Sequence, residues 1–173
     1  MWRFLFAVFL VMVCAAGTAA APAEDAGAAL NRGDYELAAR LLRSLADQGD
    51  VRAQFNLGMM YAQGQQGQDV RQDDQEALKW YRNAAEQGDA KAQFNLGAMY
   101  ENGQGVPQDA QEAVKWYRKA AELGEANAQD KLGAMYSIGQ GVSQDNQEAL
   151  KWLRKAAEQG AALAQLNLGL MYA

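Results

Sequence analysis

The chain repeats itself, and this repetition limits its fold more than any other feature. Residues 90–125 read AKAQFNLGAMYENGQGVPQDAQEAVKWYRKAAELGE, and nearly the same residues recur at 51–89, at 126–161 and, in part, at 162–173. The copies at Ala90 and Ala126 begin 36 residues apart (126 minus 90). Such a period is typical of solenoids, in which each unit buries its apolar face only against its neighbours. We therefore expect a stack of similar units.

Each copy predicts two helices joined by a turn. Apolar residues are spaced three and four apart, as on one helical face, at Ala92, Leu96, Met99 and Tyr100 and again at Ala113, Trp116, Tyr117 and Ala120. Gly103 and Gly124 follow these two runs, where a left-handed residue ends a helix. Asp109 stands three residues before Glu112, which predicts a capping box at the start of the second helix.

One glycine recurs in the middle of every first helix, at Gly58, Gly97, Gly133 and Gly169. A glycine there costs about 1 kcal/mol relative to alanine, so some other effect must offset it. Close approach of the paired helix is the natural explanation. The recurring tryptophans of the second helices, Trp80, Trp116 and Trp152, are likewise expected to pack between helices.

These residues form a recognisable pattern: Ala-x-x-x-Leu-Gly-x-Met-Tyr, then Gly-x-Gly-Val, then Ala-x-x-Trp-Tyr-Arg-Lys-Ala-Ala-Glu-x-Gly. The pattern resembles the Sel1-like repeat family, a relative of the tetratricopeptide class, over residues 51–173. The resemblance implies an all-α fold, a right-handed superhelical solenoid of helix pairs. It also implies a scaffold that binds proteins, without naming the partner.

Residues 1–23 have a different composition, with one basic residue, an apolar run and then small residues. This order is typical of a secretory signal peptide, cleaved after Ala23 or after Ala20. An uncleaved membrane anchor and a lipid-modified Cys14 are the alternatives. In each case the repeats are expected to be exported, to the periplasm or the medium if the host is bacterial, as the resemblance suggests.

The two ends of the repeat array are expected to be atypical, as in other solenoids. Residues 24–33 are Ala- and Gly-rich and are predicted to be a flexible leader. Residues 34–50 match a second helix and are predicted to be a degenerate N-terminal capping helix, whose own first helix is either the weak segment 26–31 or absent. Residues 162–173 are predicted to be a lone first helix that covers the last complete repeat.

Composition argues against several functions. The chain has 16 basic and 21 acidic residues, a net charge of −5, and its basic residues are scattered, which argues against nucleic acid and anionic membranes as partners. It has no histidine, and Cys14 would be lost with a signal peptide. The commonest catalytic bases, thiol nucleophiles and zinc ligands are therefore missing, and we expect no catalysis, cofactor or metal.

Function is expected where the copies differ but still face water. Projected at 100° per residue, each first helix leaves one narrow polar window, and successive windows would line the concave wall of the solenoid. We call these residues the inner strip: Arg52, Asn56, Met59, Gln63, Lys91, Asn95, Ala98, Asn102, Asn127, Lys131, Ala134, Ile138 and Asn167. Leu163 and Leu170 of the last helix extend it.

Two hypotheses follow for the partner. Amides and a few bases on the inner strip suit an extended segment of another exported protein, because asparagine side chains can hold a peptide backbone. Alternatively, the last helix could stack on a second copy of the chain through Leu163, Leu166, Leu170 and Met171, which would make a homodimer.

Overall fold

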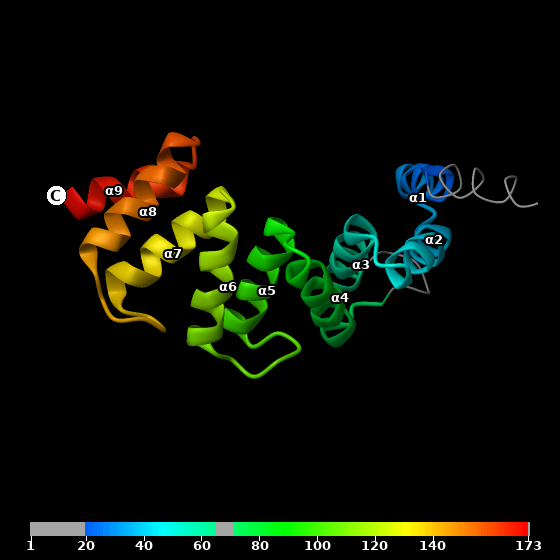
Figure 1. Cartoon of the computed structure of the whole chain (residues 1–173), viewed down its shortest axis with the longest axis horizontal. Coiled ribbons are helices and arrows are strands. Elements are labelled where there is room, and N and C mark those ends of the chain that lie inside the picture. The colour runs from blue at the N-terminus through cyan, green and yellow to red at the C-terminus, as the bar shows by residue number, and fades with distance from the viewer. Residues whose placement is uncertain (1–19, 65–70, 173) are drawn as a thin grey trace, which may run out of the picture.

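The computed structural model describes residues 20–64 and 71–172, and within them it contains nine α-helices and no strand. Cys14 lies outside these residues, and so does the predicted signal peptide except for residues 20–23. The helices are α1 (Ala20–Arg32), α2 (Tyr35–Asp47), α3 (Val51–Gln63), α4 (Asp74–Glu86), α5 (Ala90–Asn102), α6 (Ala110–Glu122), α7 (Ala126–Ile138), α8 (Asn146–Glu158) and α9 (Ala162–Tyr172). They follow one another along an arc with α1 and α9 at opposite ends (Figure 1).

Each helix packs mainly on the helices next to it in the chain, which is the arrangement of a solenoid. The buried apolar residues accordingly form a series of clusters along the arc. One cluster joins Leu42 of α2, Leu57 of α3 and Trp80 of α4. The predicted all-α helical repeat solenoid is confirmed.

The second helices begin as the capping boxes predict, but only half of each box forms. Asp109 accepts hydrogen bonds from the backbone N–H groups of Gln111 and Glu112, at 2.9 and 3.1 Å. Glu112 does not return the bond. The N–H of Asp109 donates to the carbonyl oxygen of Tyr100 instead, at 2.9 Å, and this bond closes the turn between α5 and α6. Equivalent bonds join Asp73 to Tyr61 and Asp145 to Tyr136.

The mid-helix glycines are explained by close packing within each pair. A Cβ atom on Gly97 would lie 2.8 Å from the ring of Tyr117, and one on Gly133 would lie 2.7 Å from Leu153. Gly58 meets Tyr81 in the same way. At Gly169 of α9 a Cβ atom would meet nothing within 4 Å among the described residues.

Buried glutamines tie each pair to the pair before it, which the sequence analysis missed. The side-chain Nε2 atoms of Gln54, Gln93 and Gln129 donate to backbone carbonyl oxygens of the preceding second helix, at 3.0–3.1 Å. All three side chains are buried. A buried polar group is costly unless it is hydrogen-bonded, so these bonds fix the distance between successive pairs.

The side-chain oxygen Oε1 of these glutamines accepts a hydrogen bond in two repeats and none in the third. Gln87 donates to Oε1 of Gln54 at 2.7 Å, and Gln159 donates to Oε1 of Gln129 at 2.8 Å. In the middle repeat the corresponding residue is Leu123, which is 58% exposed and has no donor to offer. The Oε1 atom of Gln93 is consequently buried without a hydrogen-bond partner among the described residues.

The N-terminal end differs from the prediction. Residues 24–33 were predicted to be a flexible leader, but residues 24–32 belong to helix α1, which pairs with α2. Its small residues make this possible, because Ala26 and Ala29 are fully buried against a core that includes Leu42 and Leu45. Residues 34–50 are therefore the second helix of a complete pair. Cleavage after Ala23, which remains a prediction, would leave both buried alanines in place.

Candidate functional site

Every predicted residue of the inner strip lies on a first helix, and none is buried. The exposed members are Arg52, Gln63, Lys91, Asn102, Asn127, Lys131 and Ile138, and the half-buried members are Asn56, Met59, Asn95, Ala98, Ala134 and Asn167. Exposure alone does not make a binding surface, so the bonds that these side chains already make decide which of them remain available.

The C-terminal half of the inner strip is occupied by bonds between neighbouring first helices. Lys131 of α7 donates to Glu101 of α5, at 3.2 Å, and Glu101 also accepts a bond from the hydroxyl of Tyr117, at 2.6 Å. Asn167 of α9 donates to Asp130 of α7, at 3.0 Å. These side chains hold successive pairs together.

Two buried tyrosines reach the inner strip with their hydroxyl groups. Burial raises the pKa of Tyr81 to about 12, while its hydrogen bond with Asn95 lowers it. Burial, followed by the hydrogen bond to Glu101, raises the pKa of Tyr117. Both phenols therefore remain neutral at physiological pH, and that of Tyr117 donates to Glu101. Asn95 and Lys131 lie at equivalent positions. Asn95 bonds directly to Tyr81, and Lys131 is connected to Tyr117 through Glu101.

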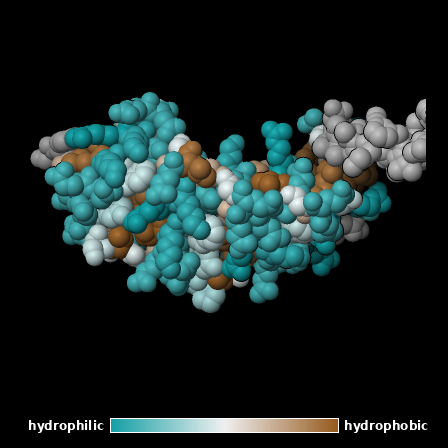
Figure 2. Space-filling model, in the orientation of Figure 1, coloured by the Kyte–Doolittle hydropathy of each residue, from teal (hydrophilic) through white to brown (hydrophobic). Residues whose placement is uncertain are grey.

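The N-terminal half of the inner strip borders a groove of about 810 Å³. Three predicted residues line it: Arg52 and Asn56 from α3, and Lys91 from α5. Apolar side chains from α1, α2 and α3 complete it, namely Leu30, Leu42, Leu45 and Phe55. Sequence reasoning missed Leu30, because the segment that carries it was predicted to be a leader. Figure 2 shows apolar surface near both ends of the arc, amid a mostly hydrophilic surface.

The charged side chains along this groove differ in whether they already have a hydrogen-bond partner. Asp50 and Asp89 also line it, but each caps a helix and accepts a backbone N–H bond, from Ala53 and Ala92 respectively, at 2.7 Å. Arg52 and Lys91 are exposed and form no hydrogen bond or ion pair with any residue in the described ranges. The cations of the groove are therefore unpaired among the described residues, whereas each aspartate already uses one carboxylate oxygen to cap a helix.

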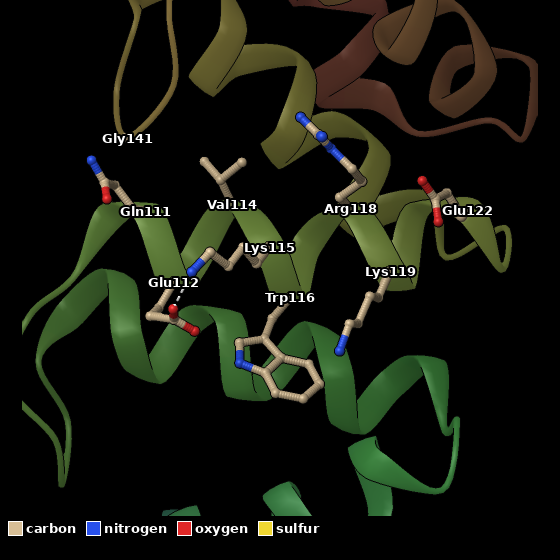
Figure 3. A pocket seen from close by; sticks show the side chains of 9 residues that line it. All are labelled: Gln111, Glu112, Val114, Lys115, Trp116, Arg118, Lys119, Glu122 and Gly141. Atoms are coloured by element: carbon tan, nitrogen blue, oxygen red, sulfur yellow. Dashed lines mark hydrogen bonds and ion pairs between the residues drawn. The ribbon is translucent and has the colours of Figure 1, made fainter.

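A second hollow, of about 470 Å³, lies along α6 around Trp116 (Figure 3). Its basic side chains already have partners, since Lys115 pairs with Glu112 and Lys119 lies 4.1 Å from the centre of the Trp116 ring. Trp80 and Trp152 differ from Trp116, because they are buried and donate to a glutamate of their own helix. Among the described residues, the hollow along α6 therefore offers no unpaired positive charge like those of the groove.

The described residues provide neither a metal site nor a membrane-spanning helix. No group of three or more acidic or sulfur-containing side chains there is arranged to hold a metal ion. No helix there is long and apolar enough to cross a membrane.

Helix pairs stacked along an arc, with a polar strip on the first helices, define an all-α repeat solenoid. The family model for the Sel1 repeat matches residues 25–50, 51–89, 90–125, 126–160 and 162–173, so the chain belongs to the Sel1 repeat family. Such repeats are generally protein–protein interaction modules and are typically not catalytic. The match at 25–50 agrees with α1 and α2 forming a complete pair.

Solved structures show the same fold. A Sel1 repeat protein from Oxalobacter formigenes is 41% identical, with a TM-score of 0.80 over 87% of this chain and 60% of that one. A protective antigen of uropathogenic Escherichia coli with an SLR fold is 40% identical, with a TM-score of 0.84 over 91% and 34% of the two chains. Cysteine rich protein B of Helicobacter pylori is 26% identical, with a TM-score of 0.56 over 71% and 91%.

The chain thus spans only part of the first two of these proteins, about 60% and 34% of their lengths. No curated protein resembles it closely enough to count as a match.

Proposed function

We propose that the protein is a non-catalytic scaffold that binds an extended segment of a partner protein on the inner strip, the concave face of the solenoid in this proposal. The groove is the observation that carries it. There Arg52, Asn56 and Lys91 surround an apolar floor, and none of the three side chains is held by another residue in the described ranges. Binding grooves combine such a floor with a few well-placed polar groups.

The experiment is site-specific photo-crosslinking in the cell that makes the protein. A photoreactive amino acid replaces Asn56 in the groove or, as the matched control, Lys115 on the outer side of α6. We expect discrete adducts from position 56 that are absent from position 115. Equal adducts from both positions, or none from position 56, would contradict binding in the groove.

Export is the second part of the proposal, supported by the composition of residues 1–23. Fractionation of the host cell, together with the N-terminal sequence of the isolated protein, tests it. We expect a protein outside the cytoplasm that begins after Ala20 or Ala23. A cytoplasmic protein that begins at Met1 would contradict export.

A homodimer through α9 is the second candidate. Leu163, Leu166 and Leu170 are 67%, 60% and 69% exposed, and α9 carries the glycine that elsewhere receives a paired helix. Burying this face against a second copy would remove apolar surface from water. Light scattering after size exclusion separates the two candidates, since a dimer that becomes a monomer after Leu163→Glu and Leu170→Glu supports self-association. A monomer at all concentrations contradicts it.

A further inference from the structure

We infer that the groove selects an acidic segment: acidic side chains of the partner pair with Arg52 and Lys91, next to an apolar side chain that covers Leu30 and Phe55. This inference rests on the proposed function and names the chemistry of its ligand. It commits to an internal segment of a partner protein, so the carboxylates come from side chains.

The two cations of the groove differ from several basic residues of the second helices, which already have partners. On the second helices, Lys79, Lys115 and Lys151 each pair with a glutamate three residues earlier. Arg82 donates to the hydroxyl of Tyr100 at 2.9 Å, and Arg118 makes the equivalent bond to Tyr136. Arg52 and Lys91 have no such partner within the described residues, although both line a groove. Their charges are therefore open to a ligand.

Their placement is regular. Arg52 is the second residue of α3 and Lys91 is the second residue of α5, so they occupy equivalent positions in successive repeats. A chain that crosses the first helices would meet one cation and then the other. Arginine and lysine are both long and flexible, so each can reach a carboxylate on such a chain.

The aspartates of the groove do not favour a basic ligand to the same degree. Asp50 and Asp89 each accept a backbone N–H bond at the start of a helix, where the helix dipole stabilises a negative charge. A basic ligand would meet carboxylates of which one oxygen is already used by a cap. An acidic ligand has no such competitor at Arg52 and Lys91.

The apolar part of the ligand follows from the apolar residues that line the groove. Leu30 of α1 and Phe55 of α3 are half-buried and line the groove above the buried Leu42 and Leu45. Asn56 lies beside Phe55 on the same helix, and its amide can bond to the backbone of an extended chain. The ligand therefore places its apolar side chain against Leu30 and Phe55 and its acidic side chains near Arg52 and Lys91.

The test uses three pools of fluorescein-labelled nonapeptides with acetylated N-termini and amidated C-termini. Each peptide has a Gly/Ser background with one Leu or Phe, followed by two acidic residues in the first pool, two Asn or Gln residues in the second and two Lys or Arg residues in the third. Two exposed ion pairs of 0.5–1 kcal/mol each correspond to an affinity ratio of about tenfold. We expect the acidic pool to bind about tenfold more tightly than the amide pool, by fluorescence anisotropy at low salt.

Two double variants with the same change of charge give the control. Arg52→Gln with Lys91→Gln removes the groove cations, whereas Lys115→Gln with Lys151→Gln removes two cations of the second helices. We expect the first variant to bind the acidic and amide pools equally, and the second to keep the tenfold preference. Loss of the preference in both variants would overturn the inference, because the effect would then come from overall charge.

The pools also separate this inference from the proposed function. Equal binding of the acidic and amide pools, or tighter binding of the basic pool, overturns the acidic ligand while leaving a peptide-binding groove. Binding from none of the pools contradicts the acidic ligand, and adducts from position 56 in the crosslinking experiment would then still support a protein partner of another chemistry.

Discussion

A single residue, Leu123, breaks the regular pattern of glutamine–glutamine hydrogen bonds in the repeats. Gln87 and Gln159 each complete the hydrogen bonding of a buried glutamine, and Leu123 stands where the third donor would be. Leaving a buried acceptor unpaired costs about 1–3 kcal/mol, while an exposed leucine gains nothing from burial. The middle repeat therefore lacks a hydrogen bond that both neighbouring repeats form.

Leu123→Gln is expected to stabilise the protein. The new amide would reach Oε1 of Gln93 as Gln87 reaches Gln54, which should raise the free energy of unfolding by about 1 kcal/mol. Urea unfolding followed by circular dichroism measures the change. Leu123→Ala removes the leucine without adding a donor and should give less than half the effect. Equal gains from the two substitutions would show that the hydrogen bond contributes nothing.

The mid-helix glycines predict opposite results at equivalent positions. Gly97→Ala places a methyl group 2.8 Å from Tyr117 and is expected to destabilise the protein by about 1–3 kcal/mol. Gly169→Ala meets no described atom within 4 Å and is expected to stabilise α9 by up to about 1 kcal/mol through helix propensity. Thermal unfolding of the two variants checks the difference in sign, and a stabilised Gly97→Ala variant would contradict close packing.

The buried phenols predict a loss of stability at high pH. The folded-state pKa of Tyr81, about 12, lies above its ordinary value of 10.0, so above pH 10 the unfolded chain loses this proton first. Stability due to this group is complete below pH 10 and falls as pH rises towards 12, by up to about 1.4 kcal/mol per pH unit. Urea unfolding from pH 9 to 12 should show a shallower decline for Tyr81→Phe than for the unchanged protein. Identical slopes would contradict the raised pKa.

At the scale of helices, the sequence is informative where large apolar residues recur and uninformative where small ones do. The spacing of Leu96 and Met99, or of Ala113 and Tyr117, predicts helices that the structure confirms. Helix α1 has no such pattern, because its buried residues are Ala26 and Ala29, which look the same in a mobile leader. Alanine becomes a core residue only when a partner helix approaches closely, and one sequence does not show that approach.

The same limit applies to the candidate site. Helical projection places the inner strip on the accessible side of the first helices, but it does not reveal which side chains are engaged. The bond from Lys131 to Glu101 joins residues 30 apart in the chain, and it forms because the stacking of the repeats brings these two side chains of α7 and α5 together. Leu30, which completes the groove, belongs to the helix that composition concealed.

Substitution of Ala29 by Asp is expected to detach α1 from α2. A charge at this fully buried position cannot be accommodated, and undocking the helix is the less costly outcome. Hydrogen exchange should show lost protection in residues 24–32 and unchanged protection in α5 to α8. Asn31→Asp changes the charge equally at an exposed position and should leave protection as it is. Protection retained in the Ala29→Asp variant would contradict the packing of α1.

At the scale of the whole molecule, each pair depends on its neighbours and on little else, because contacts along the arc are local. A defect at one end should therefore leave the other end intact. Leu132→Ala in α7 removes a fully buried side chain and is expected to cost about 2–5 kcal/mol locally.

This prediction is checked by two measurements on the Leu132→Ala variant. Hydrogen exchange should increase in α7, α8 and α9 but not in α2 and α3, and crosslinking from position 56 should be unchanged. Uniform loss of protection along the chain would show that the array unfolds as one cooperative unit.

The unpaired oxygen of Gln93 has a practical consequence for anyone who builds longer arrays from this unit. Tandem copies of residues 90–125 would contain the unpaired Gln93 oxygen in every copy, because each copy has Leu123 in place of a donor. The total loss of stability would therefore grow with the number of copies. Copies of residues 126–161 would avoid this loss of stability, because Gln159 donates to Gln129 in each copy. The choice of template, rather than the number of modules, would then decide how stable an engineered superhelix becomes.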